Sequence, residues 1–128
     1  MYIRFVTLMA DADSQESKGS FAAAYELRDS GFLPAHDGDR LQQLLAWFAS
    51  NLQIPERFNR SRRPRRANKA ISWFKPTALD HIAKAREIIA ILEEHGVHDR
   101  MISTDQPGYI VFDDEFQVVA EPYASTDR

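Results

Sequence analysis

The sequence predicts one α+β domain covering residues 1–128, with a mostly antiparallel sheet of about five strands and three helices on one face. Two kinds of periodicity and one kind of spacing support this fold class. Short runs of β-branched and aromatic residues predict strands, and apolar residues at helical spacing predict three helices. The last three strands follow one another over short turns, which is typical of antiparallel hairpins. The predicted order is β-α-α-β-α-β-β-β.

The first strand and first helix are predicted in the first 31 residues. The run "YIRFVTLM", residues 2–9, places Ile3 and Phe5 on the same side of an extended chain. In "SFAAAYELRDSG", residues 20–31, Ser20 is expected to cap a helix and Gly31 to stop it. The buried stripe of this helix is predicted to contain Phe21, Ala24 and Tyr25.

The second helix follows after a short connection. Asp37 or Asp39 is expected to cap it, and Pro55 closes the segment. Its buried face is predicted from five apolar residues at helical spacing, which are Leu41, Leu44, Leu45, Phe48 and Leu52.

Residues 55–68 show neither helical nor strand periodicity and are predicted to form a loop. Within it, "RFNRSRRPRR" places six arginines in ten positions. Connections inside compact domains usually run about four to six residues, and longer ones are often functional. This arginine-rich loop is therefore the first candidate for a functional segment.

The next strand and the third helix are predicted between residues 69 and 96. "KAISWFK", residues 69–75, has bulky side chains on both faces, which indicates a strand inside the sheet. Thr77 and Asp80 resemble a capping box, and Gly96 ends the helix. The predicted buried stripe is Ile82, Ala85, Ile89 and Leu92.

Three short strands complete the prediction: "DRMIST" at 99–104, "YIVFD" at 109–113 and "FQVVAE" at 116–121. The turns between them contain "DQPG" and "DDE", and both strand pairs are expected to be antiparallel hairpins. Pro122 and a short polar tail follow.

The charges of the chain are strongly segregated along the sequence. The formal net charge is −3, but residues 57–75 contain eight basic and no acidic residues, so the remaining residues together carry −11. Because charges are screened over about 8 Å in physiological salt, a partner that approaches the basic segment would experience mainly a positive field.

The loop and the nearby tryptophan provide the candidate binding residues, which are Arg57, Arg60, Arg62, Arg63, Arg65, Arg66 and Trp73. Arginine binds carboxylates and phosphates through paired hydrogen bonds, and it stacks on aromatic rings. We therefore expect a non-enzymatic interaction protein that binds an acidic protein surface or its own dimer mate. The alternative is binding of RNA or single-stranded DNA, although a pI of about 5.8 is low for a dedicated nucleic-acid binder. A structural alternative is that the loop pairs with the acidic hairpin of its own chain, at Asp113, Asp114 and Glu115.

The sequence gives little support for catalysis or for a cofactor. It contains no nucleophile elbow, phosphate-binding loop or dinucleotide fingerprint. A metal-assisted hydrolase or nuclease that uses Asp105 and Glu115 is the second alternative. The absence of cysteine excludes thiolate metal sites, and the four histidines show no ligand spacing. We expect no catalytic residue, no metal and no cofactor.

The N-terminal apolar run is too short to cross a bilayer, and it has no basic region or cleavage site of a signal peptide. We expect a cytoplasmic protein with no membrane partner.

Overall fold

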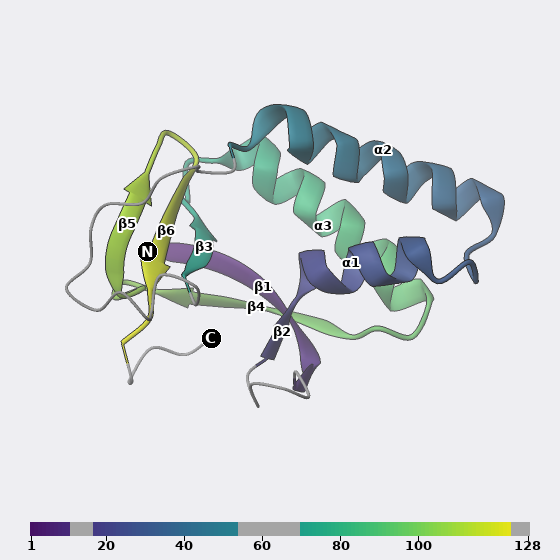
Figure 1. Cartoon of the computed structure of the whole chain (residues 1–128), viewed down its shortest axis with the longest axis horizontal. Coiled ribbons are helices and arrows are strands. Elements are labelled where there is room, and N and C mark those ends of the chain that lie inside the picture. The colour runs from purple at the N-terminus through teal and green to yellow at the C-terminus, as the bar shows by residue number, and fades with distance from the viewer. Residues whose placement is uncertain (11–16, 54–69, 124–128) are drawn as a thin grey trace.

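The computed structural model describes residues 1–10, 17–53 and 70–123 as a single α+β domain (Figure 1). The predicted fold class and element order are confirmed. The strands are β1 (Tyr2–Ala10), β2 (Ser17–Gly19), β3 (Ile71–Phe74), β4 (Asp99–Thr104), β5 (Tyr109–Asp113) and β6 (Gln117–Glu121). The helices are α1 (Ser20–Asp29), α2 (Ala35–Asn51) and α3 (Leu79–Glu94). The short strand β2 was not predicted.

The sheet is antiparallel, and its strands run β4-β1-β3-β6-β5, with β2 beside the second half of β1. β3 lies between β1 and β6, as its two bulky faces predicted. The predicted hairpin of β5 and β6 is confirmed, whereas the predicted hairpin of β4 and β5 is wrong, because β4 pairs with β1.

The connection between β4 and β5 shows that the sheet is curled. Four residues separate the two strands, so the connection reaches about 17 Å at full extension. Four strand spacings in a flat sheet would require about 19 Å. The edges that β4 and β5 form must therefore approach each other, and Figure 1 shows the end of β4 beside the start of β5.

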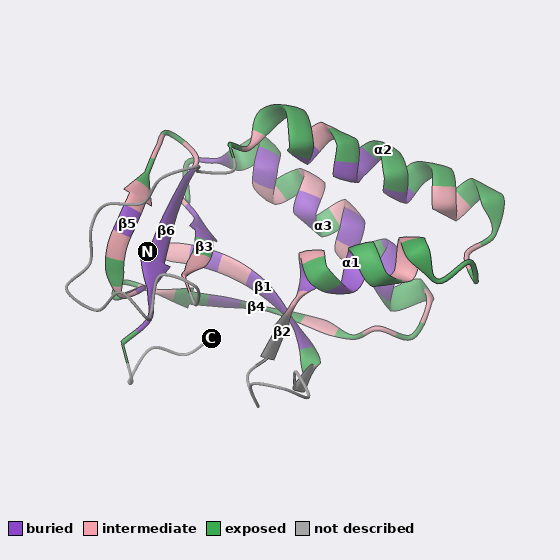
Figure 2. Cartoon of the chain, in the orientation of Figure 1, coloured by how far each residue is buried: buried purple, intermediate pink, exposed green. Residues whose placement is uncertain are grey.

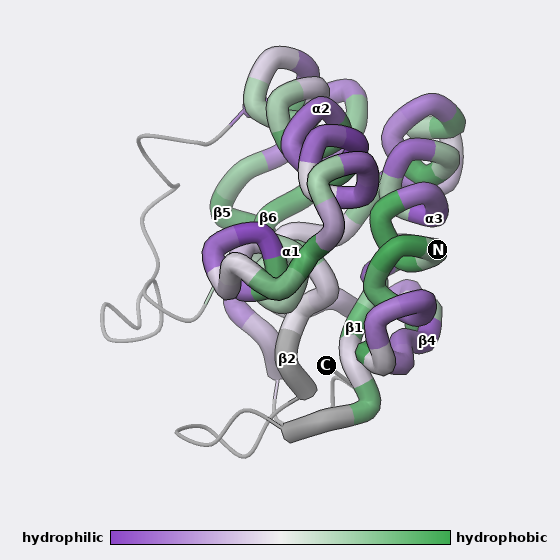
Figure 3. Tube along the Cα trace, turned by 90° about the vertical axis from the view of Figure 1, so that its right-hand side faces the viewer, coloured by the Kyte–Doolittle hydropathy of each residue, from purple (hydrophilic) through white to green (hydrophobic). Residues whose placement is uncertain are grey.

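The main core lies between the helices and one face of the sheet, to which β1 and β3 contribute Ile3, Phe5 and Phe74. Figure 2 shows that α2 and α3 bury the sides that face inward and expose the opposite sides. Figure 3 shows the same division as hydrophobic strands beside helices with hydrophilic outer turns. Of the predicted stripe of α3, Ala85 and Leu92 are buried, whereas Ile82 and Ile89 are half-buried. The other buried residues of this helix are His81, Ile88 and Ile91, which were not predicted.

A second apolar cluster lies on the concave face of the curled sheet. It contains Val6, Trp73, Ile102 and Val118, which are all buried. β3 serves both clusters, because Trp73 and the next residue point to opposite faces of the sheet.

The predicted C-terminal ends of the helices α1 and α3 are confirmed, whereas the predicted N-terminal caps are not. Gly31 and Gly96 have positive φ angles of 77° and 84° just after α1 and α3, as predicted. The predicted N-caps are wrong, because the cap positions are Gly19, Pro34 and Ala78, and no side chain caps them. The predicted cap Ser20 is instead inside α1, and its hydroxyl donates to Asp99 over 2.6 Å.

Candidate interaction site

Of the predicted binding residues, Trp73 alone lies in the part of the chain that the structure describes. Its side chain is 1% exposed on the concave face of the sheet, so it presents no surface on which a base could stack. Its Nε1 is buried without a hydrogen-bond partner in the described structure. The predicted binding residues Arg57, Arg60, Arg62, Arg63, Arg65 and Arg66 all fall within residues 54–69, outside the described part.

The described residues show how the two ends of this arginine-rich segment are attached to the fold. Gln117, which is buried in β6, donates from Nε2 to the backbone oxygen of Gln53 over 2.6 Å. The hydroxyl of Ser72, near the start of β3, donates to Gln117 Oε1 over 2.5 Å. One buried amide therefore links the last described residue before the segment to the strand that follows it. We call these three residues the Gln117 clip.

His81 supports the same region from α3. Its Nε2 lies 2.8 Å from the backbone oxygen of Asn51, at the end of α2. Because a carbonyl oxygen only accepts, Nε2 carries the hydrogen in this contact. The imidazole is 4% exposed and stacks on Phe116, with the ring centroids 4.3 Å apart. These contacts satisfy a terminal carbonyl of α2 immediately before the chain leaves the described structure.

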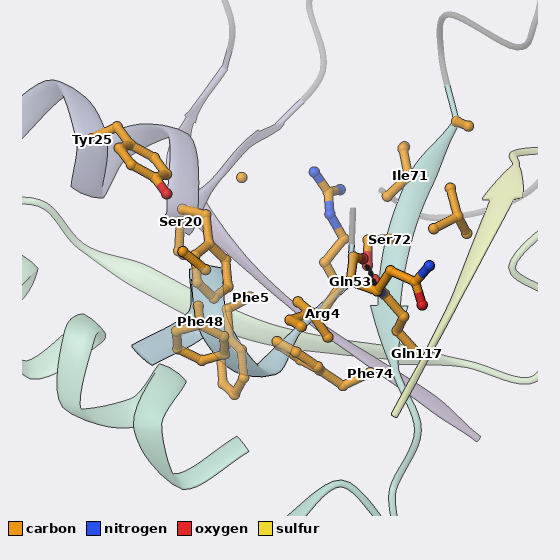
Figure 4. A pocket seen from close by; sticks show the side chains of 16 residues that line it. Arg4, Phe5, Ser20, Tyr25, Phe48, Gln53, Ile71, Ser72, Phe74 and Gln117 are labelled. Carbon is orange, nitrogen blue, oxygen red and sulfur yellow. Dashed lines mark hydrogen bonds between the residues drawn. The ribbon is translucent and has the colours of Figure 1, made fainter. Parts of the chain in front are cut away.

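A cavity of about 490 Å³ lies next to the clip, between the sheet and the helices α1 and α2 (Figure 4). Its walls are mostly apolar, and four phenylalanines contribute to them: Phe5, Phe21, Phe48 and Phe74. Gln53 and Ala70, the residues that flank the arginine-rich segment, also line it. The segment is thus attached at the rim of this cavity.

Among the described residues that line the cavity, Arg4 is the only charged one. It belongs to β1 and lies between Ile3, which pairs with β3, and Val6, which pairs with β2. Figure 4 shows its side chain extending toward the cavity beside Ser72. The guanidinium also passes close to Gly19, where a Cβ atom would lie 3.2 Å from Arg4 Nη2.

The acidic hairpin between β5 and β6 is already engaged in part by its own surroundings. Lys75 Nζ pairs with Asp113 Oδ1 over 2.5 Å, and Asp114 Oδ1 accepts hydrogen bonds from the backbone N–H groups of residues 116 and 117. Glu115 is exposed. Two of the three carboxylates therefore have partners outside the arginine-rich segment.

Asp105 and Glu115 do not form a shared site. Asp105 precedes β5 and Glu115 follows it, so a five-residue strand of about 17 Å separates them. Asp105 Oδ1 instead lies 3.1 Å from the N-terminal amine. The pair of carboxylates required by the metal-assisted hydrolase alternative is therefore not brought together.

Asp37, Glu94 and His95 form the one group of three or more metal-ligating side chains found in the described residues, with ligand atoms within 4.8 Å of one another. His95 Nε2 lies 2.9 Å from Asp37 Oδ2. Asp37 is in the first turn of α2, where the helix dipole favours its negative charge, and His95 follows α3. The contact joins two helix ends, and this accounts for the arrangement without an ion.

Asp99 is a second partly buried carboxyl, at the start of β4. It accepts the hydrogen bond from Ser20, while its Oδ2 is buried without a partner in the described structure. Burial raises the pKa of Asp99 above its ordinary value, and the charge of Glu93 raises it further, whereas the Ser20 hydrogen bond acts in the opposite direction.

Comparison with protein-family models, with curated proteins and with solved structures finds no match to this chain. Within the described ranges, no helix has both the length and the apolar character required to span a membrane.

Sequence reasoning missed the residues that build this region. A signal for Gln117 was present, because it is the one amide in the apolar run "FQVVA". Arg4 was equally visible as a charge between Ile3 and Phe5 in an apolar strand. Neither signal specifies a role, because the groups that they contact are more than ten residues away in sequence.

Proposed function

We propose that this protein is a non-enzymatic interaction protein whose arginine-rich segment binds an acidic surface of another protein or of a second copy of itself. The observation that carries the proposal is the charge segregation: residues 57–75 carry +8, and the rest of the chain carries −11. Six of these charges are arginines, which bind carboxylates through paired hydrogen bonds.

The attachment of the segment supports this function. The Gln117 clip and the His81 contact fix the chain on the N-terminal side of the arginines, and the clip also holds the strand on the C-terminal side. A binding segment with fixed ends has less conformational freedom to lose on binding.

One group of carboxylates lies far from the point where the arginine-rich segment is attached. Five acidic residues lie where α1 and α3 end and α2 begins: Asp29, Asp37, Asp39, Glu93 and Glu94. The 17-residue α2, about 26 Å long, separates this acidic end from Gln53, where the arginine-rich segment starts. That distance exceeds the screening length of about 8 Å, so the acidic end contributes little field at the attachment point.

The proposal is tested by measuring association as a function of salt. Sedimentation velocity at about 50 mM and about 500 mM NaCl would detect self-association, which should weaken at the higher concentration. Fluorescence anisotropy with labelled poly-L-glutamate and with labelled single-stranded RNA would distinguish an acidic polypeptide from a nucleic acid. For RNA, three or four phosphate contacts would lower log affinity with log salt at a slope of roughly −2 to −3.

Matched double variants would localise the effect. Arg62→Gln with Arg63→Gln should weaken the association, because both arginines lie in the segment. Arg28→Gln with Arg40→Gln removes the same charge from the surfaces of α1 and α2, and should leave it unchanged. Binding to RNA alone would favour the nucleic-acid alternative, and a protein that is monomeric and binds neither polymer at low salt would contradict the proposal.

A further inference from the structure

We propose that the cavity beside the Gln117 clip binds a small aromatic anion, with the aromatic part between the phenylalanine side chains and the anionic group at Arg4. This proposal is independent of the function of the arginine-rich segment, because it depends only on residues that the structure describes.

The size and the lining of the cavity suit a small molecule. Binding sites for small molecules usually have volumes of about 300 to 1,000 Å³, apolar walls and a few polar groups. The cavity of about 490 Å³ lies in this range. Its polar side chains lie on both sides: Ser72 and Gln117 come from β3 and β6, and Ser20 and Tyr25 come from α1, as Figure 4 shows.

The walls favour an aromatic ligand. Phe21 and Phe48 meet edge to face, with their ring centroids 4.7 Å apart and their planes at 84°. Phe74 lies 6.1 Å from each of them. Phe21 is the half-buried member of this cluster, so a further ring can pack against it in a favourable edge-to-face or offset geometry.

The charge at the cavity favours an anion. Arg4 is the one charged side chain among the described lining residues, and no described carboxylate lines the cavity. Gly19 and Ser20, at the start of the ten-residue helix α1, lie on the same wall. The positive end of the helix dipole therefore adds to the field of Arg4. An anionic group placed here gains a charge-assisted hydrogen bond, whereas a cation would be repelled.

Two fluorescent probes that differ by one charged group test both parts of the proposal. The anion 1-anilinonaphthalene-8-sulfonate and the neutral N-phenyl-1-naphthylamine share the same rings, and only the first carries a sulfonate. The full chain should bind both probes at one site, with the anion bound about tenfold more tightly, as expected for one charge-assisted hydrogen bond.

The aromatic site is tested by filling the cavity from the solvent side. Ala49 is exposed on α2 and lines the cavity, so Ala49→Leu should fill part of it without disturbing the core. This variant should weaken both probes by about tenfold or more. Ala46→Leu is the matched control, because Ala46 is exposed on the same helix and does not line the cavity.

The anionic site is tested with Arg4→Gln, which should weaken the sulfonate probe about tenfold and change the neutral probe less than about twofold. Arg40→Gln should change neither, because Arg40 pairs with Glu87 of α3 and does not line the cavity. Circular dichroism would establish that each variant is folded. If Arg4→Gln does not fold, the affinities of Arg4→Lys for the two probes replace it in this test. The ratio of the two affinities in the unmodified protein, sulfonate probe over neutral probe, then tests the anionic site without a substitution.

Three results would overturn the proposal. The first is that the unmodified protein binds neither probe with a Kd below about 100 µM, a weak affinity for a site of this size. The second is that Ala49→Leu leaves both affinities unchanged. The third is that the sulfonate probe shows no advantage over the neutral probe. If Arg62→Gln with Arg63→Gln weakens the sulfonate probe and Arg4→Gln does not, the anion binds to the arginine-rich segment, and the cavity assignment is wrong.

Discussion

Replacing Gln117 by methionine should destabilise the protein by removing the Gln117 clip while nearly preserving the buried volume. The side chain is 2% exposed and makes hydrogen bonds to Gln53 and Ser72. Each buried hydrogen bond contributes about 1 kcal/mol net, and each partner left without one adds a desolvation cost. We expect Gln117→Met to lower the free energy of unfolding by about 2 to 4 kcal/mol.

Thermal unfolding followed by circular dichroism measures this effect. For a domain of this size, 1 kcal/mol corresponds to about 3 to 4 °C, so the midpoint should fall by roughly 6 to 16 °C. Gln43→Met is the matched control, because Gln43 is exposed on α2, and its midpoint should move by less than about 2 °C. A double-mutant cycle with Ser72→Ala should give a coupling of about 1 kcal/mol. An unchanged midpoint for Gln117→Met would refute the conclusion that the clip holds the two ends.

Two further predictions concern the backbone and the pH dependence. Gly108→Ala should lower the free energy of unfolding, measured with urea, by on the order of 3 kcal/mol, because φ is +127° and a Cβ atom would lie 1.9 Å from the backbone oxygen of Glu121. Gly96→Ala is the control: φ is +84° and the space around it is open, so the loss should be only about 1 kcal/mol. Equal losses for the two variants would contradict the close approach at Gly108. Burial raises the pKa of Asp99 in the folded state, so the free energy of unfolding falls as the pH rises from about 3.8 through that raised value. The variant Asp99→Asn cannot ionise, and its side-chain oxygen still accepts the hydrogen bond from Ser20. It should therefore unfold at a higher temperature than the unmodified protein at pH 7 and lose this advantage near pH 3.8. A lower midpoint for Asp99→Asn at pH 7 would contradict this reasoning.

The sequence predicted the elements better than their partners. The helical spacing of Leu41, Leu44, Leu45 and Phe48 identified four residues that are buried in α2, because one face of this helix meets the core. The pairing of β4 with β5 was predicted from a different rule, that short connections usually join neighbouring strands, and it was wrong. The curl of the sheet allows a short connection to join two edges, and the local sequence contains no signal of that curl.

The helix starts show a related limit. Ser20 is a good N-cap residue, and the sequence places it correctly at the start of α1. In the structure its hydroxyl donates to Asp99, which is 79 residues away. A local rule cannot anticipate a competing acceptor that the fold brings from a distant strand, and the same reason explains why the partners of Gln117 were not predicted.

One feature of the sheet accounts for both the cavity and the position of the arginine-rich segment. β3 has only four residues and pairs with β1 at Ile3 alone, while β2 pairs with β1 from Val6 onward. Arg4 and Phe5 lie between these two partners, and this is where the cavity opens. In the register of Phe74 with Ile3, Ser72 and Ile71 would stand opposite Phe5 and Val6, but β3 separates from β1 at these residues. The residue before β3, Ala70, therefore lies at the cavity wall, and the segment with the six arginines joins the fold there. Closing this gap by design, with a shorter connection from Gln53 that lacks the six arginines, should therefore remove the aromatic anion site and the salt-sensitive association together, whereas Ala49→Leu should remove only the first.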